Sequence, residues 1–214
     1  MPRELGSGSA IHDYFQEWTA SGMFAALWRV ALEEYGELVG IDWQWQSLDG
    51  AMTKSPLGGE KTGKPPTDRG QLGVKRSVLV DGDGVPLGMA IAGANAHDQK
   101  LVAETFGSIP VKRPRPTPRK KQHLCPDKGY DAQAVRAVAR RRRYQFHIPV
   151  KGEPASTRKR RGAKARRWVV ERIHSWTNRA RRLLIHWEKK AVNYLAMAHR
   201  QFAITALRAA KVLG

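Results

Sequence analysis

Apolar residues recur at helical spacing near both ends of the chain. The first such stretch covers residues 11–39, and Ser21-Gly22 divides it into two short helices. The last stretch covers residues 192–213 and predicts a helix that ends at Gly214. We therefore expect a helical N-terminal arm at residues 1–40, and a C-terminal helix at residues 191–214 that packs on the domain between them.

The middle of the chain, residues 41–190, alternates between strand-like and helix-like patterns. Strands are expected at residues 41–49, where Gly50 closes the strand, at 123–127 and at 144–150. Residues 74–80 and 86–92 predict a hairpin around Asp81-Gly82-Asp83-Gly84, and helices are expected at 97–106 and 131–143. Residues 50–73, 111–121 and 151–163 are rich in Gly, Pro or basic side chains and predict loops. Strands mixed with crossover helices indicate an α/β layer architecture.

A further apolar stripe begins near residue 164 and predicts a long amphipathic helix. Its members fall on one side of the helix: Val169, Ile173, Trp176, Ala180, Leu183 and Trp187. Glu171 lies nearly opposite this stripe, beside Arg167 and Arg182. We therefore expect Glu171 to face a polar, basic side of the helix and not the core.

The charge of the chain points to a polyanionic partner. It carries 38 Lys and Arg against 19 Asp and Glu, a formal net charge of +19. An RNA binder of the ribosomal type and a protein of an acidic membrane surface are the alternatives. No run of 18 apolar residues exists, so no membrane span is expected. The single cysteine, Cys125, excludes an intrachain disulfide framework and fits a reducing, intracellular setting.

Three acids stand where metal-assisted phosphodiester chemistry would need them. Asp49 and Asp127 each close a predicted strand, and Glu171 begins the amphipathic region. Mg²⁺ prefers oxygen ligands, and two such ions about 4 Å apart activate the attacking oxygen and stabilise the leaving one. An Asp after a strand is more often a turn or cap residue, and a Glu on a polar helix face is more often solvated. The acids alone therefore leave the function open.

Several motifs in fixed order narrow the choice. Ser47-Leu48-Asp49-Gly50, Asp127-Lys128-Gly129-Tyr130-Asp131 and Arg167-Trp168-Val169-Val170-Glu171-Arg172 resemble the DDE-type transposases of insertion sequences, in particular the insertion-sequence-five-like group. Gly93-Ala94-Asn95-Ala96-His97-Asp98 and Trp176-Thr177-Asn178-Arg179 match as well, and the resemblance covers the chain from about residue 10 onwards. It implies a ribonuclease-H-like mixed sheet flanked by helices, with helical N- and C-terminal extensions.

The resemblance also implies a site and an activity. Asp49, Asp127 and Glu171 are expected to be the catalytic residues and the ligands of two Mg²⁺ (or Mn²⁺) ions. The expected reaction is cleavage at the ends of a mobile element and strand transfer into target DNA. The expected partner is double-stranded DNA, bound by a homodimer or a larger assembly in a prokaryotic cytoplasm, associated with the nucleoid. Pro126 departs from the family pattern, because it removes a strand N–H directly before Asp127.

Two alternatives to this activity stay open. Family members usually begin with a helical, basic segment that recognises the element's ends, and this chain is expected to start downstream of it. It would then be a shortened copy, either active or a catalytically inactive relic that only binds DNA. The second alternative is a ribonuclease-H-like nuclease that hydrolyses DNA without joining it.

Basic side chains near the predicted site, and Trp168 as a contact to a base, are expected to bind DNA. The set consists of Lys54, Lys128, Arg158, Lys159, Arg160, Arg161, Arg166, Arg167, Trp168, Arg172 and Arg179. A solvated basic run is the alternative for the residues of 158–167, and ordinary charge pairing with Asp131 or Glu188 is the alternative for Lys128 and Arg172. Asp98 is expected to cap the helix that starts there, and support of the metal site by His97-Asp98 is the alternative.

Overall fold

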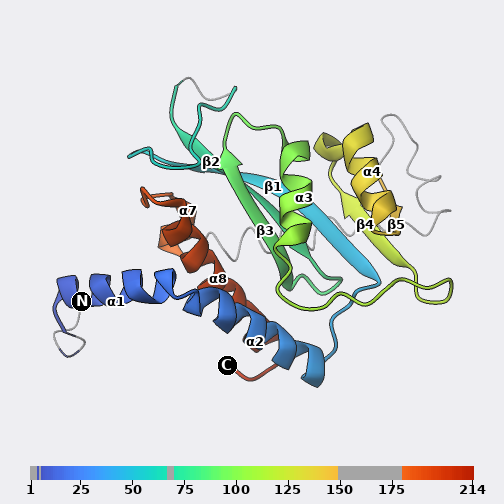
Figure 1. Cartoon of the computed structure of the whole chain (residues 1–214), viewed down its shortest axis with the longest axis horizontal. Coiled ribbons are helices and arrows are strands. Elements are labelled where there is room, and N and C mark those ends of the chain that lie inside the picture. Colours follow the sequence, from blue (N-terminus) through green and yellow to red (C-terminus); the bar gives the residue numbers. More distant parts are fainter. Residues whose placement is uncertain (1–3, 5, 67–69, 149–179) are drawn as a thin grey trace.

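The fold is built on one mixed sheet of five strands in the order β3-β2-β1-β4-β5 (Figure 1). A computed structural model describes residue 4 and residues 6–66, 70–148 and 180–214. The strands are β1 (Trp45–Lys54), β2 (Gly73–Val80), β3 (Pro86–Gly93), β4 (Gln122–Pro126) and β5 (Tyr144–Phe146). β2 runs antiparallel to both β1 and β3, whereas β4 runs parallel to both β1 and β5. The mixed sheet expected from the resemblance is therefore confirmed.

The central strand β1 is longer than the sequence pattern predicts. Closure of the strand at Gly50 is wrong, because the antiparallel ladder with β2 continues from Ser47↔Val80 to Lys54↔Gly73. The parallel ladder with β4 is much shorter and ends at Leu48↔Pro126. Asp49 therefore lies inside β1, but directly beyond the last residue that β4 accompanies.

The β2–β3 hairpin forms as predicted, and Asp81 organises its turn. The Asp81 side chain is buried and accepts hydrogen bonds from the backbone N–H groups of Asp83 (3.0 Å) and Val85 (2.8 Å). It also accepts one from the Tyr35 hydroxyl (3.1 Å). Burial raises the pKa of Asp81 to about 6, against the effect of these hydrogen bonds, which lower it.

Helices cover both faces of the sheet. The N-terminal helices α1 (Gly8–Ala20) and α2 (Met23–Leu38) are separated at Gly22, whose φ of +74° an L side chain rarely adopts. α2 packs beside α8 (Ala191–Ala209), and both contribute to the core through Trp28, Tyr194 and Phe202. These helices and their break agree with the predicted pattern.

Consecutive residues of β3 show which helix covers which face, because neighbouring side chains in a strand point in opposite directions. Met89 lines a small cavity together with Phe202 of α8, whereas Gly88 lies against the backbone of Thr105 in α3 (Val102–Gly107). α4 (Gln133–Arg141) packs beside α3 and β5. The sheet is thus a layer between α8 on one side and α3 on the other (Figure 1).

The long amphipathic helix predicted through Trp187 is wrong in the part that the structure describes. Only the short helix α7 (Arg181–Leu184) forms there, and the chain then becomes extended. Ile185 pairs with Lys54 in a parallel bridge, and the N–H of His186 donates to the Lys54 carbonyl (2.8 Å). The backbone N–H of His186 is thus bonded to β1 and cannot form the helical hydrogen bond that a longer α7 would require. Trp187 is left 46% exposed.

Two short 3-10 helices lie beside the candidate site, η2 (Asp98–Leu101) and η3 (Lys128–Tyr130). Among the described residues, no helix combines the length and the apolar character that a membrane crossing requires.

Candidate active site

Asp49 and Asp127 lie side by side where the parallel ladder between β1 and β4 ends. Leu48↔Pro126 is the last pair of that ladder; Asp49 is the next residue within β1, and Asp127 directly follows β4. Neighbouring strands lie about 4.8 Å apart, so the two residues leave the ladder as neighbours. Both are partly buried, and Asp49 Oδ1 accepts a hydrogen bond from the Gly50 N–H (2.8 Å). Two residues separated by 78 positions in sequence are thus brought together by strand pairing.

A third carboxylate, that of Asp98, lies against the same point of β1. A Cβ atom added to Gly50 would lie 2.7 Å from Asp98 Oδ1 and 3.1 Å from the Tyr130 hydroxyl. A Cβ atom added to Gly129 would lie 3.4 Å from Asp98 Oδ2. Asp98 therefore approaches both the Asp49–Gly50 part of β1 and the segment that follows Asp127, and glycine at position 50 leaves the space that its carboxylate occupies.

Asp98 is held there by an ion pair and is not a helix cap. Lys75 Nζ on β2 lies 3.1 Å from Asp98 Oδ1, and both side chains are largely shielded from solvent. The residue in the N-cap position of η2 is His97, and its side chain makes no capping hydrogen bond. The prediction that Asp98 caps this helix is therefore wrong, because the side chain turns toward Lys75. The match of residues 93–98 to the family motif was the sequence feature that could have indicated a place for Asp98 near the site.

Tyr130 lies beneath the three aspartates. Its ring is buried, and its hydroxyl lies 3.4 Å from the Ser77 hydroxyl, to which the Thr105 hydroxyl donates (3.0 Å). Burial raises the pKa of Tyr130 well above its ordinary value, and the nearby charges of Asp98, Asp49 and Asp127 raise it further. Tyr130 thus stays neutral and presents a hydroxyl to a site rich in carboxylates.

Pro126 is the last residue of β4, and its ring nitrogen faces β5 at the point where the β4–β5 ladder ends. The His123 N–H donates to the Gln44 carbonyl on the β1 side, whereas the Leu124 carbonyl accepts from His147 on the β5 side. Since directions alternate along a strand, position 126 faces β5, and the β4–β5 pairing ends at Leu124↔Phe146. The missing N–H of Pro126 therefore points beyond the paired part of β5.

Most of the other predicted site residues belong to parts of the chain that the structure does not describe. Glu171 lies outside the described residues, as do Arg158, Lys159, Arg160, Arg161, Arg166, Arg167, Trp168, Arg172 and Arg179. The backbone of Lys128 begins η3, but its side chain is likewise outside the description. Lys54 is exposed at the far end of β1. In the described ranges, no group of three or more His, Cys, Asp or Glu residues is arranged as a metal site.

Comparisons with known proteins agree with the motif order. The family model described as "Transposase DDE domain" matches residues 46–206. A putative transposase for insertion sequence element IS402 from Burkholderia cepacia is 34% identical over 140 residues, which cover 63% of this chain and 63% of that protein. The alignment thus spans less than two thirds of that relative's length.

Solved structures give weaker matches. The Mos1 mariner paired end complex with Mn has 12% sequence identity and a TM-score of 0.32, over 75% of this chain and 60% of that one. The Mos1 strand transfer complex has 12% identity and a TM-score of 0.33, over 75% and 59%. The family match itself covers most of the chain, including both aspartates at the end of the parallel ladder. The chain belongs to the transposase DDE domain family.

Proposed function

We propose that this chain is a DNA transposase that cuts at the ends of an insertion element and joins the freed ends to target DNA. The observation that carries the proposal is the position of Asp49 and Asp127, adjacent at the end of the β1–β4 ladder in a chain of this family. Carboxylates within a strand or directly after one are held by the sheet, and positioning of a reacting phosphodiester requires such fixed groups. The net charge of +19 supports a DNA substrate.

The donor set suits a divalent cation, which transposases of this family generally use. Asp49 and Asp127 offer carboxylate oxygens, the ligands that Mg²⁺ and Mn²⁺ accept. Two Mg²⁺ or Mn²⁺ ions are the expected number. When bound, such ions supply Lewis acidity at the attacked phosphate and stabilise the charge on the leaving oxygen. Beside them, the ion pair between Lys75 and Asp98 fixes the Asp98 carboxylate next to Gly50.

Glu171 is proposed as the third acid. Ala180, the first described residue after it, is nine positions further along the chain, and the adjoining segment is fixed to the end of β1 by the Lys54–Ile185 bridge. Nine residues span about 13 Å as a helix and up to about 30 Å when extended. Lys54 is five residues, or about 17 Å, from Asp49 along β1. The chain length therefore allows Glu171 to reach the two aspartates.

The proposed reaction has two steps. Water attacks the phosphodiester at the element's end, the bond from phosphorus to the 3′-oxygen breaks, and that oxygen leaves as a 3′-hydroxyl. The 3′-hydroxyl then attacks a phosphodiester of target DNA, which forms one P–O bond and breaks another. No covalent bond to the enzyme is needed in either step. Joining requires two element ends to be held together, so a homodimer or a larger assembly is part of the proposal.

The test is an assay of Mg²⁺-dependent cleavage and strand transfer on duplexes from the DNA that flanks the gene. Asp49→Asn, Asp127→Asn and Glu171→Gln should each lower cleavage by roughly 100-fold or more, because each removes charge at the reacting phosphate. Asp131→Asn is the matched control, since Asp131 is exposed and paired with Arg136 (2.7 Å).

The outcomes separate the alternatives. Activity that survives all three substitutions would contradict the assignment of Asp49, Asp127 and Glu171 as catalytic residues. DNA binding without cleavage by the unaltered chain supports the inactive relic. Cleavage without joining supports a ribonuclease-H-like nuclease.

A further inference from the structure

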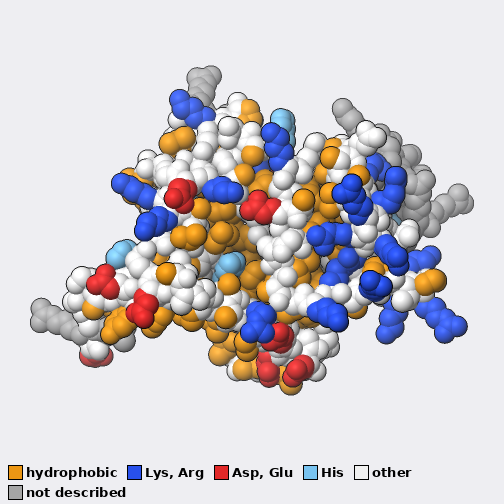
Figure 2. All heavy atoms as spheres, in the orientation of Figure 1, with side chains coloured by type: hydrophobic (Ala, Val, Ile, Leu, Met, Phe, Trp, Pro, Cys, Tyr) orange, Lys and Arg blue, Asp and Glu red, His pale blue; other side chains and the backbone are white. Residues whose placement is uncertain are grey.

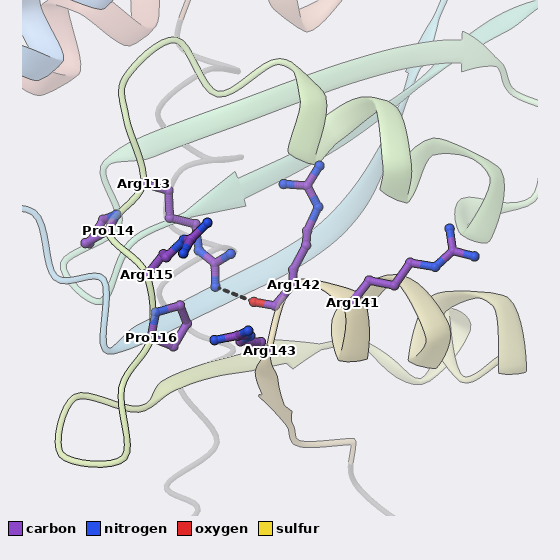
Figure 3. A pocket seen from close by; sticks show the side chains of 7 residues that line it. All are labelled: Arg113, Pro114, Arg115, Pro116, Arg141, Arg142 and Arg143. Atoms are coloured by element: carbon purple, nitrogen blue, oxygen red, sulfur yellow. Dashed lines mark hydrogen bonds between the residues drawn. The ribbon is translucent and has the colours of Figure 1, made fainter.

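A hollow lined by five arginines lies at the end of the sheet opposite the aspartates. It has a volume of about 290 Å³, and two prolines complete its lining. Two of the arginines belong to the segment before β4 and three to the end of α4 (Figure 3): Arg113, Arg115, Arg141, Arg142 and Arg143. Figure 2 shows Lys and Arg side chains gathered over the side of the molecule where α4 and β5 lie.

Arg113 is fixed in this hollow by neutral partners. Its guanidinium donates to Gln122 Oε1 (2.6 Å) and to the Arg142 carbonyl (3.0 Å), and it lies 3.9 Å above the centre of the Tyr144 ring. Gln122 in turn donates to the Pro114 carbonyl (3.0 Å), so the proline-rich segment is tied to the start of β4. The arginine is therefore preorganised, and none of these partners carries an opposing charge.

Burial makes this arrangement costly without an anion. Burial lowers the pKa of Arg113, and the nearby charge of Arg142 lowers it further. The guanidinium of Arg142 lies 5.0 Å from the centre of the Phe106 ring, which is also a neutral neighbour. Among the described residues, none that line the hollow is acidic, and no ion pair involves any of its five arginines. An anion in the hollow would relieve this repulsion.

The helix end alone does not explain the cluster. Cations near the C-terminus of α4 are stabilised by the helix dipole, which accounts for arginines at its last turn. Arg113 and Arg115 belong to a different segment and gain nothing from that dipole. Arg143 also adopts φ +58°, a conformation that glycine or asparagine takes more easily. Arg143 thus occupies a backbone conformation that favours another residue type.

The hollow and the aspartates are separated by the length of β4. Gln122, which holds Arg113, begins the strand, and Asp127 follows its last residue. Five residues of strand span about 17 Å, and successive phosphates of one strand of duplex DNA advance about 3.4 Å along the axis. The spacing therefore corresponds to about five nucleotides.

We infer that this hollow binds the phosphate backbone of DNA about five nucleotides from the scissile phosphate. Arginine suits the task because its planar guanidinium donates two parallel hydrogen bonds to a phosphate. The inference rests on the proposed function, because it takes the polyanion to be the DNA on which the aspartates act. It adds a second, non-catalytic contact that holds the duplex in register.

The experiment measures affinity and its salt dependence without divalent metal, so that no cleavage is required. The probe is a 30-base-pair DNA duplex of arbitrary sequence. The test variant is Arg115→Gln with Arg143→Asn, since both side chains are exposed and Asn tolerates the backbone at position 143. The matched control is Arg200→Gln with Arg208→Gln, which removes the same charge from exposed positions of α8.

The expected result is a loss confined to the test variant. Each phosphate contact contributes about 0.9 to the slope of log K against log salt, so the slope should fall by about 1.8 and the affinity at 0.1 M salt by at least about tenfold. The control should lose less than about twofold, and thermal unfolding should show that both variants fold.

Equal losses in the two variants would overturn the inference, as would absence of duplex binding or tighter binding to RNA of the same sequence. If binding follows the expected pattern but the chain never cleaves DNA, the result would support phosphate binding in the hollow and contradict the proposed function.

Discussion

The two ends of strand β4 differ in charge although they are only a few residues apart. At the end that carries Asp127, three aspartates meet around Gly50 and Tyr130, with Lys75 beside them. At the other end, five arginines line a hollow whose described lining contains no acid. Aspartates suit a cation, and arginines suit a phosphate. In the functions proposed above, one short strand therefore separates the place of the reaction from a place that holds the substrate.

The two ends also differ in what holds them together. The aspartate end depends on close approach of backbone atoms, since Gly50 leaves room for the Asp98 carboxylate. The arginine end depends on side-chain hydrogen bonds, in which Gln122 and Tyr144 fix the segment around Arg113. A change at the first end should thus affect rate, whereas a change at the second should affect stability and binding.

Gly50→Ala should have the largest effect and should act on rate. The added methyl would lie 2.7 Å from Asp98 Oδ1 and 3.1 Å from the Tyr130 hydroxyl, so the carboxylates must shift. A shift of this kind lowers catalysis by about 100-fold, and DNA affinity should stay the same. Cleavage rates at saturating DNA measure this. Gly107→Ala is the control, because nothing lies within 4 Å of its added methyl. A rate within threefold of the unaltered chain would contradict the account.

Tyr144→Phe should lower stability and leave rate per folded molecule unchanged. The Tyr144 hydroxyl donates to Gln46 Oε1 (2.6 Å), and Gln46 is fully buried. Loss of the donor leaves a buried acceptor unpaired, which lowers the free energy of unfolding by about 2 kcal/mol. Urea denaturation measures the change. A loss of cleavage rate larger than the loss of folded protein would show that the two ends are coupled.

Acid should reduce the stability contributed by two histidines, His123 on β4 and His147 directly after β5. His123 Nδ1 and His147 Nε2 are 2.8 Å apart, and the Trp45 ring stacks on His123. Burial lowers the pKa of both below 6.5, and for His123 the charges of His147 and Lys121 lower it further. At these two positions the unfolded chain thus binds more protons below pH 6.5, so their contribution to the free energy of unfolding should fall as the pH drops from 7 to 5.5. Asp81, whose pKa is raised to about 6, contributes in the opposite direction.

His147→Gln should reduce that dependence, because glutamine keeps a hydrogen-bonding nitrogen and has no charge to gain. Urea denaturation at the two pH values gives the comparison. His12→Gln serves as the control, since His12 is exposed on α1. If both variants keep the full pH dependence, groups other than this pair are responsible.

Pro126→Val should have the smallest effect. Its missing N–H faces the β5 side just beyond the last ladder pair, so a restored N–H adds at most one hydrogen bond at the end of the ladder. Cleavage rate should stay within about twofold and the free energy of unfolding within about 0.5 kcal/mol, as for substitutions away from special features. A large gain in rate would mean that proline displaces Asp127.

Local patterns in the sequence predicted what local interactions determine. The hairpin turn around Asp81 and the helix break at Gly22 depend on neighbouring residues, and both were predicted correctly. The length of β1 was not, because its last residues are held by β2, which begins at Gly73. The same applies to Ile185, which leaves the expected helix to pair with Lys54.

In the candidate site, too, the features that depend on distant partners were not predicted from the sequence. Motif order identified Asp49 and Asp127, and strand pairing places them side by side. The role of Asp98 depended on a lysine 23 positions away, so a capping pattern was misleading. The proline-rich segment 111–121 has no regular structure, as predicted, but the sequence did not reveal that Gln122 fixes it. Glu171 and the basic residues of 158–179 stay predictions.

The bridge between Lys54 and Ile185 has a consequence for how relatives of this chain can vary. The bridge and the neighbouring hydrogen bond from the His186 N–H to the Lys54 carbonyl are made by backbone atoms alone. Every residue type other than proline carries both backbone groups. Side chains at positions 54 and 185 can therefore differ among relatives while this segment stays docked on β1, whereas proline at position 186 would remove the donor.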